Sequence, residues 1–292
     1  AIGPMIAIVT RDSTLASGNV NGRMRLFDYM KSPIYIGSVN IDSLAVTNIP
    51  LGNFSVKSTN QREDQILVKA TLLSDDNDLE VAGNYNTTEK EPLHFKMDLK
   101  KMNAKTIEAF SFGELKRASG TLSGQVDITG STDAPKLKGS VDFNKVSFNA
   151  NQLGAQYFID KQSILFDQQR ITFPNFTVSD SLNQQMKVTG YVSLAHLPDV
   201  GYNLGIQSKN FTVLHSTQKQ NDLFYGKAKA DASVTVKGIG SSMVIDGKVK
   251  LNPGSKVTFV MPNQATDEGN LSQGVIEFVD MKNQTLKDSS EI

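Results

Sequence analysis

Apolar and polar side chains alternate along almost the whole chain. Val126 and Ile128, and Val234 and Val236, are examples of apolar residues two positions apart with polar residues beside them. A period of two is expected of β-strands that have one buried face and one solvated face. Clusters of Gly, Asn, Asp, Ser and Pro separate the runs at turn spacing, as in residues 130–135. This pattern predicts an antiparallel, hairpin-connected, all-β protein.

The alternation changes phase within the run at residues 141–148. The apolar positions move from Val141 and Phe143 to Val146 and Phe148. An extra residue in one strand shifts the side chains in this way. We therefore predict a bulge or a short turn at residues 144–145.

One segment, residues 103–111, has helical spacing instead. Ala104, Ile107 and Phe110 recur every three residues behind Asn103, which is a suitable N-cap. The spacing predicts a helix of two to three turns. We expect its apolar stripe to pack on the end of the sheet rather than to bind a ligand.

The chain opens with an apolar stretch, Ala1–Val9. This stretch is less than half of the roughly 20 residues that a membrane span needs, and no basic segment precedes it. It predicts a first strand. Because the pattern starts without a lead-in, we expect the sequence to be a fragment of a longer protein.

The pattern repeats at a distance of about 105 residues. Residues 33–41 match residues 135–143, with Pro, Gly, Ser and Val identical, and residues 126–143 match residues 234–251. A further match, between residues 79–103 and 186–210, has nearly the same offset. We predict a first repeat over 1–117 ending in the short helix, a second over 118–224, a third, incomplete one over 225–280, and a flexible tail over 281–292.

The repeats share apolar alternation and glycines, whereas their polar positions vary. What is repeated is therefore a surface and not a set of reactive side chains. Repeats that each leave an apolar face open stack into a quasi-one-dimensional array, and a long sheet curls as it twists. We predict an elongated antiparallel sheet that is curled, with an apolar concave face.

The alternation also assigns the side chains that point inward. From the alternation alone, they fit a closed β-sandwich core as well as an open groove. The inward set in the matched strands is Val126, Ile128, Leu137, Val141, Phe143, Phe166, Phe173, Met186, Val188, Leu204, Ile206, Val234, Val236, Ile245, Val249 and Leu251.

Composition removes several function classes. The chain has 30 Lys and Arg against 30 Asp and Glu, so charge gives no reason to expect nucleic acid as a partner. Without Cys there is no disulfide, thiol nucleophile or Cys-ligated metal, and only three His are present. We predict a protein that is not an enzyme and has no catalytic residues, cofactor or metal site.

Three short motifs resemble chemical sites in part. The acidic run at residues 75–78 lacks the spacing of an EF-hand and predicts an exposed hairpin tip. His196 and Asp199 come without a nucleophile motif, so a solvated turn is expected. The run at residues 238–240 lacks the third Gly of a dinucleotide loop, and a strand follows it instead of a helix.

Several stretches resemble one known family. Residues 120–148, 164–191 and 224–261, with the run at 274–280, are similar to the repeats of the TamB and AsmA-like superfamily of Gram-negative envelope proteins, in a form typical of Bacteroidetes. By this resemblance, residues 224–280 lie just before the family's C-terminal domain, and an N-terminal anchor and a complete C-terminal domain are expected to be missing.

The resemblance implies a β-taco, a U-shaped sheet with a hydrophobic groove along its axis. It also implies a periplasmic protein, anchored in the inner membrane, that carries phospholipid acyl chains between the inner and outer membranes along the inward set. One alternative is assembly or translocation of outer-membrane β-barrel proteins, in which the sheet edge pairs with client strands or with an Omp85-type barrel by β-augmentation. Another is a non-catalytic structural or adhesin-like protein whose apolar face is simply buried.

Overall fold

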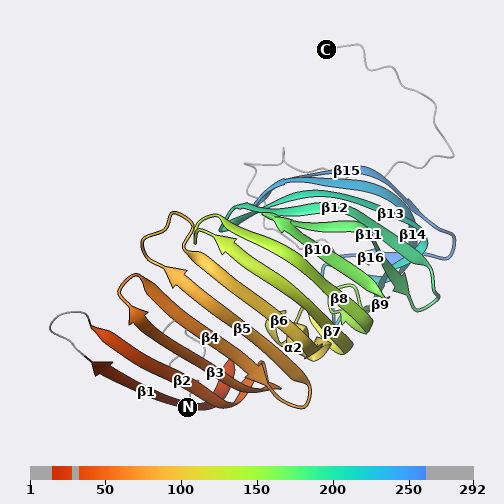
Figure 1. Cartoon of the computed structure of the whole chain (residues 1–292). Coiled ribbons are helices and arrows are strands. Elements are labelled where there is room, and N and C mark those ends of the chain that lie inside the picture. Colours follow the sequence, from red (N-terminus) through yellow and green to blue (C-terminus); the bar gives the residue numbers. More distant parts are fainter. Residues whose placement is uncertain (1–14, 28–32, 261–292) are drawn as a thin grey trace, which may run out of the picture. The chain divides into compact units, whose positions relative to one another are not determined.

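The computed structural model describes residues 15–27 and 33–260 of the 292-residue chain. These residues form one antiparallel sheet of 16 strands and one short helix, so the predicted all-β fold class is confirmed (Figure 1). All of the elements lie in one unit, Ala1–Phe259. The predicted strand at Ala1–Val9 and tail at 281–292 lie outside the described residues.

The elements follow one another closely along the chain. They are β1 (Ala16–Phe27), β2 (Ile34–Val46), β3 (Ile49–Arg62), β4 (Gln65–Leu73), β5 (Asn77–Asn86), β6 (Leu93–Asn103), α2 (Ala104–Phe110), β7 (Leu115–Gly130), β8 (Pro135–Ala150), β9 (Ala155–Ile159), β10 (Gln162–Gln168), β11 (Arg170–Asp180), β12 (Gln185–His196), β13 (Asp199–Ser216), β14 (Phe224–Ile239), β15 (Ser242–Leu251) and β16 (Lys256–Phe259).

Strand order in the sheet follows chain order with one interruption. The path runs from β1 to β8, then through β10 to β15. β9 and β10 both pair with β8, β10 along Leu137–Phe143 and β9 along Val146–Ala150. The change of partner falls at Lys145, whose φ is 49°, and the pairing of β7 with β8 shifts between Ser119 and Thr121, opposite this point. The predicted bulge at residues 144–145 is therefore confirmed.

The register of the ladders places the alternating apolar residues on one face. Directly paired residues point to the same side of a sheet. Ile128 pairs with Leu137, and Val141 pairs with Ile164. We call the side that carries Val126 and Val141 the inner face, and the opposite side the outer face.

The outer face carries the charges. Lys69 on β4 and Glu80 on β5, which lie diagonally across the two strands, form a salt bridge of 2.8 Å. Gln125 donates a hydrogen bond to Asp98 across β6 and β7 at 3.3 Å. At these positions the strands separate an apolar side from a polar side, as the period of two predicts.

Three hairpins have the same register, which agrees with the sequence repeat. Gly37 lies opposite Met24, Gly139 lies opposite Val126, and Gly247 lies opposite Val234. The equivalent positions are 102 and 108 residues apart, which are the offsets of the sequence matches. The limits of the repeats remain predictions.

The second of these glycines sits where the strands approach closely. Gly139 has a φ of 148°, and a Cβ there would lie 2.0 Å from the carbonyl oxygen of Gln125. At the equivalent Gly37 the nearest atom to an added Cβ, the Ser58 carbonyl oxygen, is 3.9 Å away. The second hairpin therefore needs glycine, whereas the first does not.

The predicted helix is present, but its packing differs from the expectation. Asn103 is the N-cap and accepts a hydrogen bond from the backbone N–H of Lys105. Of the predicted apolar stripe, Ala104 is buried, but Ile107 and Phe110 are 36% and 55% exposed. The packed face of α2 consists of Ala104, Thr106 and Ala109, because these small side chains let the helix lie close to β3, β6 and β7.

One buried polar residue fixes this helix. Asn77, at the start of β5, is 2% exposed. Its Oδ1 accepts hydrogen bonds from the Thr106 hydroxyl at 2.9 Å and the Asn103 backbone N–H at 3.1 Å, and its Nδ2 donates to the Leu51 carbonyl at 2.8 Å. The Asn77 side chain thereby orients the first turn of α2 and determines which of its faces packs on the sheet.

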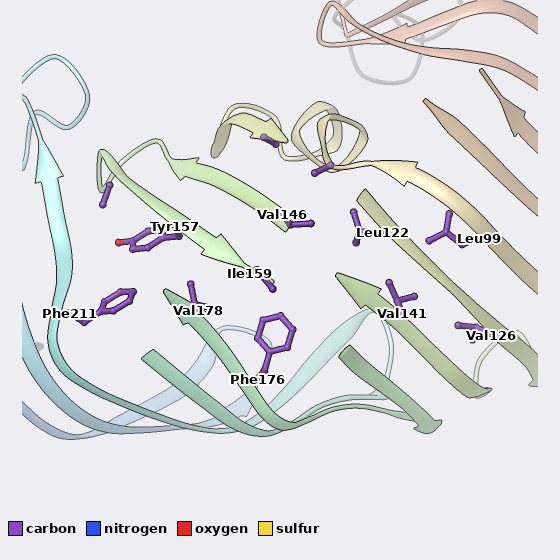
Figure 2. Packing of buried hydrophobic residues seen from close by; sticks show 13 residues of the cluster. Leu99, Leu122, Val126, Val141, Val146, Tyr157, Ile159, Phe176, Val178 and Phe211 are labelled. Carbon is purple, nitrogen blue, oxygen red and sulfur yellow. The ribbon is translucent and has the colours of Figure 1, made fainter. Parts of the chain in front are cut away.

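The core lies on the inner face, in the middle of the sheet. Figure 2 shows side chains from β6, β7, β8, β9, β11 and β13 pointing toward a common interior. The labelled residues are Leu99, Leu122, Val126, Val141, Val146, Tyr157, Ile159, Phe176, Val178 and Phe211. A smaller cluster of buried residues lies beneath α2 and contains Ala16, Val46, Leu51, Leu72 and Ala109.

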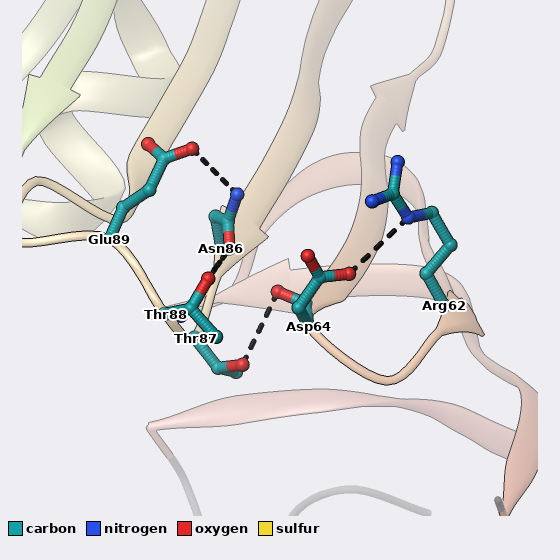
Figure 3. Close-up of polar contacts among 6 residues, drawn as sticks. All are labelled: Arg62, Asp64, Asn86, Thr87, Thr88 and Glu89. Atoms are coloured by element: carbon teal, nitrogen blue, oxygen red, sulfur yellow. Dashed lines mark hydrogen bonds and ion pairs between the residues drawn. The ribbon is translucent and has the colours of Figure 1, made fainter.

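The turns after β3 and β5 are joined by polar contacts (Figure 3). The backbone N–H and the hydroxyl of Thr87 donate to the carbonyl of Asp64, at 2.8 and 3.3 Å. Arg62 forms an ion pair with Asp64, and Asn86 donates to Glu89 at 2.6 Å. Polar side chains therefore occupy the turns at this end of the sheet, whereas the inner face of the strands is apolar.

Candidate functional site: the apolar inner face

The ladder register places all sixteen residues of the predicted inward set on the inner face. Their burial differs along the sheet. Val126 and Val141 are buried in the core; Ile128, Leu137, Phe143, Phe166, Phe173, Met186 and Val188 are half-buried against it; Leu204, Ile206, Val234 and Val236 are half-buried; and Ile245, Val249 and Leu251 are exposed.

The middle of the inner face is closed. Val126, Val141 and Phe176 are 2%, 7% and 7% exposed. They are covered by other apolar side chains of the same cluster. In this section the inner face has the packing of a protein core, one of the two possibilities that the alternation left open.

Both ends of the described sheet are open on the same face. On β1 and β2, Met24 and Val39 are 68% and 45% exposed. On β15, Ile245 and Val249 are 68% and 62% exposed. These side chains continue the apolar face beyond the closed section in both directions.

The inner face also includes strands that the predicted inward set omits. The register runs from Val39 through Val56, Ala70 and Val81 to Met97 and on to Val126. The repeat contains the missing signal, because Val39 corresponds to Val141 in the match between residues 33–41 and 135–143. Phe176 and Val178 were missed because the bulge between Phe173 and Phe176 changes the parity of β11.

Among the described residues, one charged side chain points to the inner face where the strands pair without a register shift. Asp180, at the end of β11, is 1% exposed. Its carboxylate accepts hydrogen bonds from the backbone N–H groups of Leu182 and Gln184, and from the backbone N–H and hydroxyl of Thr212, at 2.7 to 2.9 Å. Burial alone would raise the pKa of Asp180, but the bonds from Thr212, Gln184 and Leu182 outweigh it and hold the pKa below its ordinary value.

Tyr157 lies next to this carboxylate in the core. Its ring stacks on Phe211 with centroids 5.5 Å apart, and its hydroxyl donates to the Thr212 carbonyl at 3.2 Å. Burial, with a smaller contribution from the charge of Asp180, raises the pKa of Tyr157 to about 12. Both groups keep their polar atoms bonded, so they tie β9 and β11 to β13.

The acidic run at residues 75–78 and the His196–Asp199 pair lie at hairpin ends. His196 pairs with Asp199 at the end of the β12–β13 hairpin, and the carbonyl of Asp75 accepts a hydrogen bond from Lys101. Within residues 15–27 and 33–260, no group of three or more His, Asp or Glu is placed to hold a metal ion.

The described residues contain no helix with the length and apolar character that a membrane span requires.

The fold and the inner face define a class of protein: a long antiparallel sheet of repeated hairpins that presents a continuous apolar face. Residues 174–291 match the family model of the TamB C-terminal domain. This match supports membership of the chain in the TamB/AsmA-like family of envelope-biogenesis proteins, whose members act as transport or assembly modules. Neither a curated protein nor a solved structure matches the chain significantly.

The family match corrects one expectation. Residues 224–280 were expected just before the C-terminal domain, but they lie within the matched segment. β12 to β16 are therefore part of the region that resembles this domain.

Proposed function

We propose that the inner face holds phospholipid acyl chains and lets them move along the sheet, from strand to strand, between the inner and outer membranes. The observation that carries the proposal is the continuity of the inner face. The inner face runs from β1 to β15 and is exposed at both described ends. Where the strand pairing is regular, Asp180 is the charged side chain of the described residues that points to this face. The family match supports a role in envelope biogenesis.

The physical basis is the hydrophobic effect. An acyl chain in water exposes apolar surface at a cost of about 25 cal/mol for each Å². Side chains such as Val39 and Ile245 cover that surface while the polar head group stays in solvent. Because neighbouring strands present similar side chains, movement from one to the next within an open section changes the free energy little. No catalytic group, cofactor or metal is required.

The proposed setting follows from the family. Its members are envelope-associated, so we place the protein in the periplasm, with the full-length protein anchored in the inner membrane.

A second candidate function is assembly of outer-membrane β-barrel proteins by β-augmentation. All ten residues of β15 are exposed, and among the described strands β15 pairs with β14 alone. Such an edge could pair with a client strand or with an Omp85-type barrel. A third candidate is a structural or adhesin-like role, in which the inner face has no mobile occupant.

Two adjacent residues of β15 distinguish these candidates. Val244 and Ile245 are both apolar and both 68% exposed, but they point to opposite faces. A photoreactive benzoyl-phenylalanine is placed at each position in turn, in the protein expressed in a Gram-negative envelope. After irradiation, adducts are identified by mass spectrometry.

Lipid transport predicts phospholipid adducts at Ile245 and none above background at Val244. Pairing of β15 with a protein strand predicts protein adducts at both positions, because a paired strand lies beside both faces. Equal lipid labelling at the two positions, or none at Ile245, would contradict the proposed function.

A further inference from the structure

The closed middle section of the inner face contains a group of three aromatic rings. Phe143 lies on β8, and Phe173 and Phe176 lie on β11, with β10 between these strands. The ring centroids of Phe143 and Phe176 are 5.3 Å apart at an interplanar angle of 80°, and those of Phe173 and Phe176 are 5.8 Å apart at 84°. Edge-to-face contacts of this kind are favourable beyond simple burial. The three rings therefore bridge the inner face across β10.

The two outer rings of this group differ from the central one in burial. Phe176 is 7% exposed and belongs to the closed core, whereas Phe143 and Phe173 are only half-buried against it. Phe173 also lies directly opposite Gly190 on β12, so no side chain stands beside it at that position. Of these rings, Phe173 has both partial exposure and an unfilled neighbouring position, which makes its rotation the least costly.

We propose that Phe143, Phe173 and Phe176 form an aromatic gate, and that an acyl chain passing between the β1–β2 and β14–β15 sections must displace the Phe173 ring from Phe176. This inference rests on the proposed function. In the closed gate, Phe173 packs edge-on against Phe176. In the open gate, the acyl chain takes that place on Phe176, so the apolar contact is replaced rather than lost. The gate makes passage slower than loading at either end.

The chain offers a matched control residue. Phe166 on β10 is also a half-buried phenylalanine of the inner face, and it also lies opposite a glycine, Gly139. Phe166 has no ring contact in the part of the chain that the structure describes. The variants Phe173→Ala and Phe166→Ala therefore remove similar apolar area, but only the first opens the gate.

Two measurements test the gate. Transfer of a fluorescent phosphatidylethanolamine from quenched donor vesicles to phosphatidylcholine acceptor vesicles gives the rate of passage for the purified chain. The lipid adduct at Ile245 gives loading. We expect Phe173→Ala to raise the transfer rate by about two- to tenfold, which corresponds to the loss of one ring contact, with loading unchanged. Phe166→Ala should not raise it.

The outcomes separate the gate from the function beneath it. Unchanged or slower transfer in Phe173→Ala, with lipid still bound at Ile245, overturns the gate and leaves the proposed function standing. Equal acceleration in both variants also overturns it, because general loosening would then be the cause. If the wild-type chain gives no lipid adduct at Ile245, the proposed function fails, and the gate fails with it. Phe173→Leu keeps most of the apolar volume, and should still accelerate transfer if Phe173→Ala proves poorly folded.

Discussion

The carboxylate of Asp180 on β11 accepts two hydrogen bonds from Thr212 on β13, from the backbone N–H at 2.9 Å and from the hydroxyl at 2.7 Å. β12 lies between these strands only in part, because it begins at Gln185 and pairs with β13 as far as Ser208. Beyond that point the Asp180 side chain supplies the acceptor that a strand carbonyl would provide. A buried charge thus takes over part of the pairing at this end of the sheet.

We predict that Asp180→Asn lowers the free energy of unfolding by about 2 kcal/mol at neutral pH, because the amide NH₂ would face N–H donors. Denaturant unfolding measures this. The sign of the pH dependence follows from the depressed pKa of Asp180 in the folded state. Its contribution is complete above the ordinary pKa of 3.8 and is lost as the pH falls through the lower folded value. The variant should therefore lose less stability than wild type below about pH 4. Parallel pH profiles for both proteins would contradict this role.

Replacing glycine by alanine is predicted to have different effects at the equivalent positions of the first and second hairpins. In Gly139→Ala the new methyl group would meet the Gln125 carbonyl oxygen at 2.0 Å, in a backbone conformation that alanine rarely adopts. We expect a loss of at least about 2 kcal/mol in unfolding free energy. Gly37→Ala, at the equivalent position of the first hairpin, should be neutral or slightly stabilising, since glycine in a strand is entropically unfavourable. Similar melting temperatures for the two variants would refute the close approach.

Asn77 gives a prediction about α2 alone. Asn77→Ala removes the partner of the Thr106 hydroxyl and of the Leu51 carbonyl, whereas the Asn103 N–H keeps its hydrogen bond to the Asp76 carbonyl. Each unsatisfied buried group costs about 1–3 kcal/mol. Hydrogen exchange measured by mass spectrometry should show faster exchange in residues 104–110, with little change in β12 to β14. Uniform acceleration over the whole sheet would instead mean that Asn77 supports global stability.

Much of the fold was predictable from sequence because a sheet with one apolar face has a strict period of two. That period gave the strands, the common face of the sixteen inward residues and, through its change of phase, the bulge at Lys145. Long-range polar contacts were not predictable. Ile107 and Phe110 have the right spacing for a packed stripe, but Asn77, which lies 26 residues before Asn103, turns a different face of α2 toward the sheet.

The extent of closure was also beyond the sequence. Val126 and Val234 occupy equivalent positions in their hairpins, yet Val126 is buried in the core and Val234 is half-buried. The difference depends on which strands curl over each position. No local pattern records that, because the alternation in the two hairpins is the same.

The last prediction uses this difference to separate folding from binding. Glutamate at Val126, which is 2% exposed, places a carboxylate in the closed core, so Val126→Glu should cost more than about 4 kcal/mol and unfold the sheet or leave it poorly folded. Glutamate at Ile245, which is 68% exposed, should change the unfolding free energy by no more than about 0.5 kcal/mol. Ile245→Glu should nevertheless reduce the phospholipid that co-purifies with the chain, because it adds a charge to the open inner face. Val244→Glu, equally exposed on the outer face, should keep both stability and lipid.

Mass spectrometry of extracted lipid, with circular dichroism of each variant, provides the measurement. Equal lipid loss in Ile245→Glu and Val244→Glu would mean that the charge itself, and not its position on the inner face, determines binding.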